Sequence, residues 1–379
     1  MSERINVMRP WLGQEEINAV AEAISSGWVA QGPRVIAFEE EFATAMQAEF
    51  AVATSSCTTA LHLALVVAGI GPGDEVVIPS FSFIATANAV RYVNADPVFA
   101  DVDPESGNVT AATVTAALTP RTRAVIVVDQ GGVPADLDAI RAVTDPRDIV
   151  VVEDAACGAG STYKGAPVGA GAVLTAWSFH PRKLLTTGEG GMLTTSNREW
   201  ADRARQLREH AMSVSAAERH RSTLPAAETY PEVGFNYRMT DLQAAVGRVQ
   251  LGRLPEIVAR RRAIAARYAA AIADIDGLRA VADPDHGTSN FQSFWVEVSL
   301  PYPTDREGLL GALANADISA RRGIMATHRE KPYRHLIPEG GLPATDRLHD
   351  GTLILPVYHQ MTDAEQDRVI DVLRTPVSI

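Results

Sequence analysis

The sequence predicts an α/β fold, with a mostly parallel sheet that carries helices on both faces and a small α+β unit after it. From about residue 50 onward, short apolar runs alternate with helical stretches, which is the pattern of β–α–β units. Most of these runs are continuously apolar, as expected for strands that are covered on both faces. The order of the elements and the apolar character of the strands together favour this class of fold.

The first predicted element is a helix over residues 14–25, followed by a loop at 26–33 that contains two glycines and a proline. The helix has one apolar stripe with i, i+3, i+4, i+7 spacing, formed by Ile17, Val20, Ala21 and Ile24. Strands are predicted next, at 51–54, 75–79, 97–102, 123–128, 149–153, 173–178 and 191–195. In such a sheet, binding sites form at the carboxyl ends of the strands.

The C-terminal part begins with a long predicted helix over about 240–275, which ends near Gly277. In the stretch 291–300, apolar residues alternate with polar ones, so we expect a half-exposed strand there. Helices near 305–315 and 363–374 complete a small α+β unit. We therefore expect a large domain at 12–250 and a small one at 251–379, joined by the long helix, with residues 1–11 packing on it.

The composition argues against several classes of protein. The net charge of −12 speaks against nucleic acid, which needs a basic surface, but a local basic site can still bind an anionic small molecule. The sequence has no apolar run long enough for a membrane-spanning helix, so we expect no membrane partner. The N-terminal segment lacks the apolar stretch of a signal peptide, so a cytoplasmic location is expected. Cys57 and Cys157 form no CxxC pair, and no metal site is expected.

Lys183 follows an apolar strand in the segment WSFHPRKLLTTGEGG. A loop lysine is usually a solvated charge, but the glycines of this segment let the backbone approach a ligand closely. Ser178, at the end of the strand, is placed to donate a hydrogen bond to a phosphate. An amine used for Schiff-base chemistry needs a lowered pKa, which we expect from partial burial beside a cation such as Arg182 or a pyridinium ring.

Asp154 ends the apolar strand in VVVEDAACGAG, at the edge of the sheet where sites form. An aspartate at this position can equally be a turn or helix-cap residue. The functional alternative is a carboxylate that keeps a pyridine nitrogen protonated, so that the ring can act as the electron sink of pyridoxal-phosphate chemistry.

Two further segments carry candidate cofactor contacts. In AVATSSCTTALHLAL, hydroxyl residues lie where a strand ends and a helix begins, a position that favours a phosphate and is equally consistent with ordinary helix capping. In IPSFSFIATANAV, Phe81 and Phe83 directly follow a strand. Either ring can stack on a flat cofactor or pack in the core.

Taken in this order, the four segments resemble the DegT/DnrJ/EryC1/StrS family of sugar aminotransferases, which depend on pyridoxal 5′-phosphate (PLP) and have the aspartate-aminotransferase fold (fold type I). The similarity covers about residues 5–375. SFHPRKLLTTGEGG is similar to the most specific signature of the family, which implies that Lys183 is the catalytic lysine and holds PLP as a Schiff base. EDAACGAG is similar to the EDAAQ/EDAAH block, which implies that Asp154 binds the pyridine nitrogen.

The same resemblance assigns the other cofactor contacts. It implies that Thr58 and Thr59, helped by Ser178, bind the cofactor phosphate, and that Phe83 covers the ring. The block GFNYRMTDLQAAVG is typical of the family. Its asparagine, Asn236, would reach the phosphate in a neighbouring subunit, which implies a homodimer with shared active sites.

Three departures from the family pattern lie near the expected site. Cys157 stands where the family usually has Gln or His beside the cofactor's hydroxyl, and a thiol is a weak hydrogen-bond partner. Cys57 replaces a common glycine, and Asp129 replaces the usual histidine of another block.

Two segments suggest the subgroup. SGWVAQGP resembles enzymes that aminate the 4-position of nucleotide-linked 4-keto-6-deoxy sugars, and ISARRGIMATHREKPY resembles enzymes that make dTDP-4-amino-4,6-dideoxyglucose. In the second segment, Arg322 and His328 are candidate substrate contacts, because a basic cluster suits a diphosphate. A plain surface loop is the equal alternative.

The resemblance thus implies transfer of an amino group from L-glutamate to a nucleotide-linked 4-keto-6-deoxy sugar, with dTDP-4-keto-6-deoxyglucose as the leading candidate, in amino-sugar biosynthesis. A keto-cyclitol aminotransferase or another PLP enzyme of the family is the first alternative. Dehydratase relatives have a histidine in place of Lys183, so the lysine speaks against a dehydratase. A non-catalytic regulatory protein on the same fold is expected to lose Lys183 or Asp154, and both are present. A dinucleotide-binding protein has no support, because GIGPGD lacks the GxGxxG spacing.

Overall fold

The computed structural model describes residues 4–214 and 228–376. Its central element is a seven-stranded sheet with the order β1-β9-β8-β5-β4-β2-β3. The strands are β1 (Phe50–Thr54), β2 (Glu75–Pro79), β3 (Asp96–Ala100), β4 (Thr122–Val128), β5 (Val150–Asp154), β8 (Leu174–Ser178) and β9 (Gly191–Thr195). β9 alone runs in the opposite direction to the other strands of this sheet. The predicted, mostly parallel sheet is confirmed, and each predicted strand lies within two residues of an observed one.

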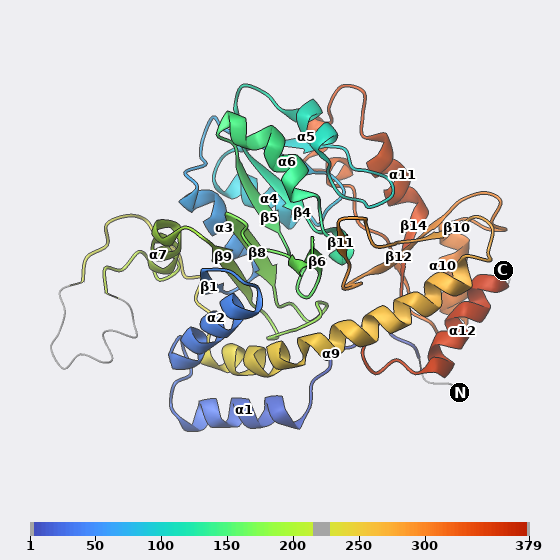
Figure 1. Ribbon diagram of the computed structural model, residues 1–379, viewed down its shortest axis with the longest axis horizontal. Helices are drawn as coiled ribbons and strands as arrows, with labels where there is room; N and C mark the ends of the chain where they lie inside the picture. The colour runs from blue at the N-terminus through green and yellow to red at the C-terminus, as the bar shows by residue number, and fades with distance from the viewer. Residues whose placement is uncertain (1–3, 215–227, 377–379) are drawn as a thin grey trace.

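Helices cover both faces of this sheet (Figure 1). Side chains alternate along a strand, and on β4 Ile126 belongs to one core while Val125 and Val127 belong to the other. One face carries α3 (Cys57–Val67), α4 (Ala85–Tyr92) and α7 (Arg198–Leu207), and the opposite face carries α2 (Pro33–Ala45), α5 (Ala111–Ala117) and α6 (Leu137–Thr144). Because both faces are buried, the strands are apolar throughout, as the sequence indicated.

Helix α9 (Asp241–Ile272) is 32 residues long and connects the two parts of the chain. In Figure 1 it runs from α1 (Gln14–Ser25) and α2 to α12 (Asp363–Arg374) on the far side of the molecule. Its first residue, Asp241, also accepts hydrogen bonds from Gly32 N and Val35 N, at 2.8 and 3.0 Å, and so caps α2. The first turn of α9 and the start of α2 are therefore fixed together.

The C-terminal unit is a four-stranded antiparallel sheet with the order β10-β12-β14-β13. Its elements are β10 (Leu278–Ala280), β12 (Phe294–Val298), α10 (Arg306–Asn315), β13 (Arg321–Arg322), α11 (Pro343–Gly351), β14 (Thr352–Leu355) and α12. A small third sheet contains β11 (Gly287–Thr288), β6 (Thr162–Tyr163) and β7 (Ala166–Pro167). Residue 250, the expected domain boundary, lies inside α9, and the division into two domains stays a prediction.

One prediction for this unit is wrong. The strand expected to be half-exposed is β12, and its first four residues are all buried. Trp295 and Val296 belong to the same hydrophobic core, while the buried carboxylate of Glu297 is paired with Arg279 and Arg347 at 2.7 and 2.6 Å. A buried charge is tolerated when it is paired in this way. Within the described parts of the chain, no helix is long and apolar enough to cross a membrane, α9 included.

Candidate active site

Two adjoining cavities lie at the carboxyl ends of β5 and β8, beside the N-terminus of α3. The smaller one, of about 290 Å³, is lined by residues that include Ser56, Thr58, Asp154, Ser178 and Lys183. The larger one, of about 560 Å³, shares Phe83, Arg182 and Lys183 with it and extends to the C-terminal unit. The structure thus brings most of the predicted site residues together at the edge of the sheet where the fold forms sites.

Lys183 lies in the loop after β8, and its amine is enclosed between the two thiols and Asp154. Nζ donates a hydrogen bond to Cys157 Sγ at 3.1 Å. Burial lowers the pKa of Lys183. The nearby Cys157, Cys57 and Asp154 raise it by more than burial lowers it, so the pKa of Lys183 lies above its usual value. The lowering expected from Arg182 is not found, because Cys157, Cys57 and Asp154 dominate the surroundings of the amine.

Asp154, the last residue of β5, is buried. Its carboxylate accepts hydrogen bonds from Thr86 Oγ1 at 3.1 Å and from Ala156 N at 3.2 Å, and it has a weaker contact with Cys57 Sγ at 3.8 Å. Burial is the main cause that raises the pKa of Asp154. None of the three hydrogen-bonded groups is cationic, so this buried carboxylate can still pair with a protonated ring nitrogen.

The N-terminus of α3 forms another wall of the smaller cavity. Ser56 caps the helix, and Thr59 Oγ1 accepts from Ser56 N at 3.1 Å and donates to Ser56 O at 2.7 Å. Thr58 and Ser178 line the cavity, whereas Thr59 does not. A helix N-terminus with free hydroxyl groups is a ready site for a phosphate. The geometry therefore supports Thr58 and Ser178 as phosphate contacts, and it does not support Thr59, whose hydroxyl closes the capping box.

Gly191 explains why the glycine-rich segment borders this site. A Cβ atom at this position would lie 2.4 Å from the carbonyl carbon of Ser56, closer than real atoms approach. The start of β9 therefore packs directly against the first turn of α3, which only glycine allows. This contact holds the N-terminal end of α3 beside the loop that carries Lys183.

Comparison with known proteins identifies the family. The model of the DegT/DnrJ/EryC1/StrS aminotransferase family matches residues 10–374. The chain belongs to this family. The spore coat polysaccharide biosynthesis protein SpsC of Bacillus subtilis is 40% identical over 372 residues, which are 96% of this chain and 95% of SpsC.

Solved structures of aminotransferases are similar over nearly the whole chain. The aminotransferase TlmJ of Streptoalloteichus hindustanus has a TM-score of 0.90 at 38% identity, with 98% of each chain covered. The sugar aminotransferase Spr1654 of Streptococcus pneumoniae, in its PLP form, has a TM-score of 0.91 at 27% identity, again with 98% of each chain covered. The protein is a PLP-dependent sugar aminotransferase of fold type I.

The residues of the smaller cavity fit this cofactor. Lys183 offers an amine, Asp154 offers a buried carboxylate without a bonded cation, and the α3 N-terminus with Thr58 and Ser178 offers donors for a phosphate. These groups lie on separate elements but face one cavity. These groups thus match the aldehyde, the ring nitrogen and the phosphate of PLP.

Three other predicted cofactor residues of the aminotransferase have distinct positions. Phe83 lines both cavities and is 65% exposed, while the neighbouring Phe81 is buried in the core. Cys157 lines the larger cavity and contacts the lysine. Asn236 lines neither cavity, and its side-chain oxygen accepts from Arg238 Nε at 3.1 Å. Its expected contact with a neighbouring subunit stays a prediction.

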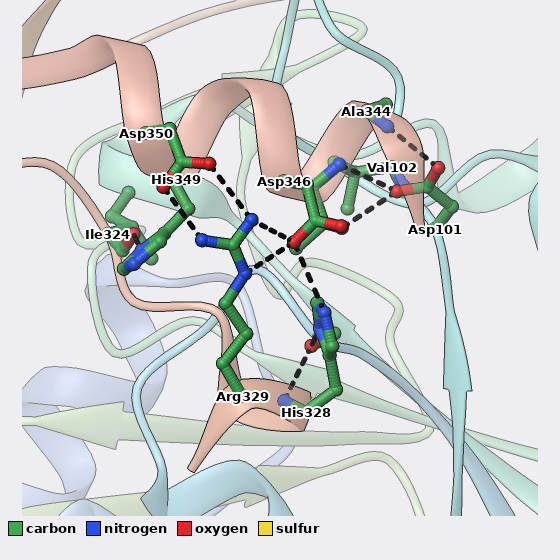
Figure 2. A network of polar contacts seen from close by, with 11 residues as sticks. Asp101, Val102, Ile324, His328, Arg329, Ala344, Asp346, His349 and Asp350 are labelled. Carbon is green, nitrogen blue, oxygen red and sulfur yellow. Dashed lines mark hydrogen bonds and ion pairs between the residues drawn. The ribbon is translucent and has the colours of Figure 1, made fainter. Parts of the chain in front are cut away.

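His328 lies outside the lining of both cavities and is only 3% exposed. Figure 2 shows it pointing toward Asp346 on α11, with Nε2 at 3.2 Å from the carboxylate. Its Nδ1 lies 2.7 Å from Ser80 Oγ. Burial is the main cause that lowers the pKa of His328. Both ring nitrogens are engaged, so the geometry assigns this residue to packing of its loop and does not support the predicted substrate contact.

Arg322 does line the larger cavity, but its guanidinium is already held by Glu307, at 2.9 and 2.6 Å. Sequence reasoning did not single out Thr86, which bonds Asp154, or Arg321, which lines the same cavity as Arg322. Thr86 is one of several hydroxyl residues after a strand, and no local pattern marks it. Arg321 stands next to Arg322, and the sequence alone does not distinguish the two.

Proposed function

We propose that the enzyme transfers an amino group from L-glutamate to the 4-keto position of a nucleotide-linked 4-keto-6-deoxy sugar, with dTDP-4-keto-6-deoxyglucose as the first candidate. One observation carries this substrate class. The cavity that holds Lys183 adjoins a larger one whose lining, among the residues that the structure describes, contains no carboxylate and five basic side chains: Arg182, Lys183, Arg261, Arg321 and Arg322. Such a surface suits a sugar that carries a negatively charged linker. SpsC, named for polysaccharide biosynthesis, supports a sugar substrate.

When bound, PLP supplies the aldehyde that carries the amino group and a ring that withdraws electrons from the reacting carbon. Lys183 binds the cofactor at rest, and its released amine moves the proton at the α-carbon of the donor and at the sugar carbon that is aminated. Asp154 holds the proton on the ring nitrogen. Thr58, Ser178 and the α3 N–H groups bind the phosphate, and Phe83 covers the ring. We also propose that a second copy of the chain contributes Asn236.

The test is product analysis by NMR after incubation of the enzyme with PLP, L-glutamate and either dTDP-4-keto-6-deoxyglucose or the keto-cyclitol scyllo-inosose. We expect 2-oxoglutarate and a 4-amino sugar with the nucleotide-linked ketone, and no amination of the cyclitol. The Lys183→Ala variant should lose both turnover and the visible absorbance of covalently held cofactor. Amination of the cyclitol alone would refute the substrate and leave the cofactor assignment intact.

A further inference from the structure

The basic lining of the larger cavity is a local feature, because the chain as a whole has a net charge of −12. Three of its cationic side chains already have partners. Lys183 bonds Cys157, Arg322 is held by Glu307, and the buried guanidinium of Arg261 donates to the carbonyl groups of residues 291, 292 and 357. These three groups therefore offer little to a ligand's charge.

Arg182 and Arg321 differ from them. No acceptor or acidic group in residues 4–214 and 228–376 bonds either guanidinium, although both line the cavity. Arg182 stands beside Lys183, and its backbone oxygen accepts from Gln292 Nε2 at 3.0 Å, which fixes the loop to the segment before β12. Arg321 comes from the edge strand β13 of the C-terminal sheet. Two elements far apart in the sequence thus bring two uncompensated cations to one cavity.

The two charges act on each other. Burial lowers the pKa of Arg321, and the charge of Arg182 lowers it further. Like charges held together without an acid between them are unfavourable, and an anion with two charges removes this cost. A guanidinium fork matches the oxygens of a phosphate group, so two forks match two linked phosphates. The γ-carboxylate of glutamate brings only one negative charge and leaves one guanidinium without a partner.

We infer that Arg182 and Arg321 together bind the diphosphate of the nucleotide-linked sugar, and this inference rests on the proposed function. The sugar would then lie between these arginines and Lys183. Arg321 also lines a third cavity of about 790 Å³, whose lining includes neither Lys183 nor Arg182, so a nucleoside has room beyond the diphosphate. The assignment replaces Arg322, the arginine expected from the sequence, with its neighbour.

The test compares the wild-type enzyme with Arg182→Met and Arg321→Met, which remove the charge and keep most of the length. Arg123→Met is the matched control, because Arg123 is an exposed surface residue outside the cavities, with its nearest acid 3.9 Å away. Calorimetry measures the binding of dTDP, UDP and GDP to each PLP-loaded protein. A separate assay follows the glutamate half-reaction by the change in cofactor absorbance, without any nucleotide. Thermal unfolding checks that each variant is folded.

We expect each cavity variant to weaken binding of the preferred nucleoside diphosphate by roughly tenfold to hundredfold, the usual loss for a hydrogen bond to a charged group. The glutamate half-reaction should be unchanged in Arg321→Met, whose side chain does not line the smaller cavity, and the Arg123→Met protein should be unchanged in both assays. Unaltered nucleotide binding in both cavity variants would overturn the inference while the proposed function stands. An equal loss in the glutamate half-reaction would overturn it in favour of a donor-carboxylate site. A wild-type enzyme that binds no nucleoside diphosphate would overturn both proposals.

Discussion

Replacing Cys157 with alanine is expected to make Lys183 capture PLP faster in the cofactor-free enzyme. Cys157 accepts a hydrogen bond from Lys183 Nζ at 3.1 Å, and it is the main neighbour that raises the pKa of Lys183 against the effect of burial. A hydrogen bond to a charged group contributes about 1.5–3 kcal/mol, and about 1.4 kcal/mol is a tenfold change in protonation. Because only the neutral amine attacks an aldehyde, capture at neutral pH should become roughly tenfold faster or more.

Stopped-flow absorbance measures this rate across a series of pH values. Cys157→Ser keeps an acceptor at the same place and separates the effect of the sulfur atom from that of the hydrogen bond itself. Cys57→Ala is the graded comparison and should have a smaller effect, because Cys57 also raises the pKa of Lys183, though less than Cys157 does, and its own contact is with Asp154 at 3.8 Å. If Cys157→Ala and the wild type capture PLP with the same pH midpoint, then Cys157 does not set the protonation of Lys183 and the reasoning fails.

Three further outcomes are expected. Burial raises the pKa of Glu153 from 4.5 to about 7, so the folded state keeps a proton that the unfolded state loses. Stability of the cofactor-free enzyme should therefore fall as pH rises through that window, and Glu153→Gln should flatten the fall in urea titrations. His328→Ala should cost about 1–3 kcal/mol of unfolding free energy and leave the KM for the sugar unchanged; a raised KM would restore the substrate contact. Gly191→Ala should cost about 1–3 kcal/mol or more and weaken PLP binding, whereas Gly71→Ala, which meets no atom within 4 Å, should do neither.

The sequence predicts the elements of this fold well where the signal is local. The apolar stripe of α1 gives its bounds correctly, and the continuous apolar runs give the strands of the large sheet within two residues. Helix α2 was not predicted, although Val35, Phe38 and Phe42 have helical spacing and all three are buried. The exposure of β12 was predicted wrongly, because a glutamate in a strand usually faces solvent. In the fold, Arg279 and Arg347 from other elements pair with Glu297 and allow it to be buried.

In the candidate site too, features with a local signal could be predicted and contacts between distant segments could not. Lys183 and Asp154 stand out because each lies in a distinctive segment at the end of a strand, and the sheet brings these strand ends together. The packing contacts of His328 could not be read from the sequence, because its partners, Ser80 and Asp346, are distant from it in the chain, and its role as a substrate contact stays a prediction. The pKa of Lys183 follows from groups on other elements as well, and no segment read alone contains them.

The neighbours Arg321 and Arg322 show most clearly that contacts between distant segments cannot be predicted from a local sequence. They pair with Ile354 and Leu353 of β14, and both line the larger cavity. Arg322 meets Glu307 of α10, which compensates its charge, while Arg321 meets the charge of Arg182. A basic pair in the sequence thus becomes one structural ion pair and one uncompensated cation. Which of the two serves a ligand depends on the position of Glu307, and that position is a property of the fold.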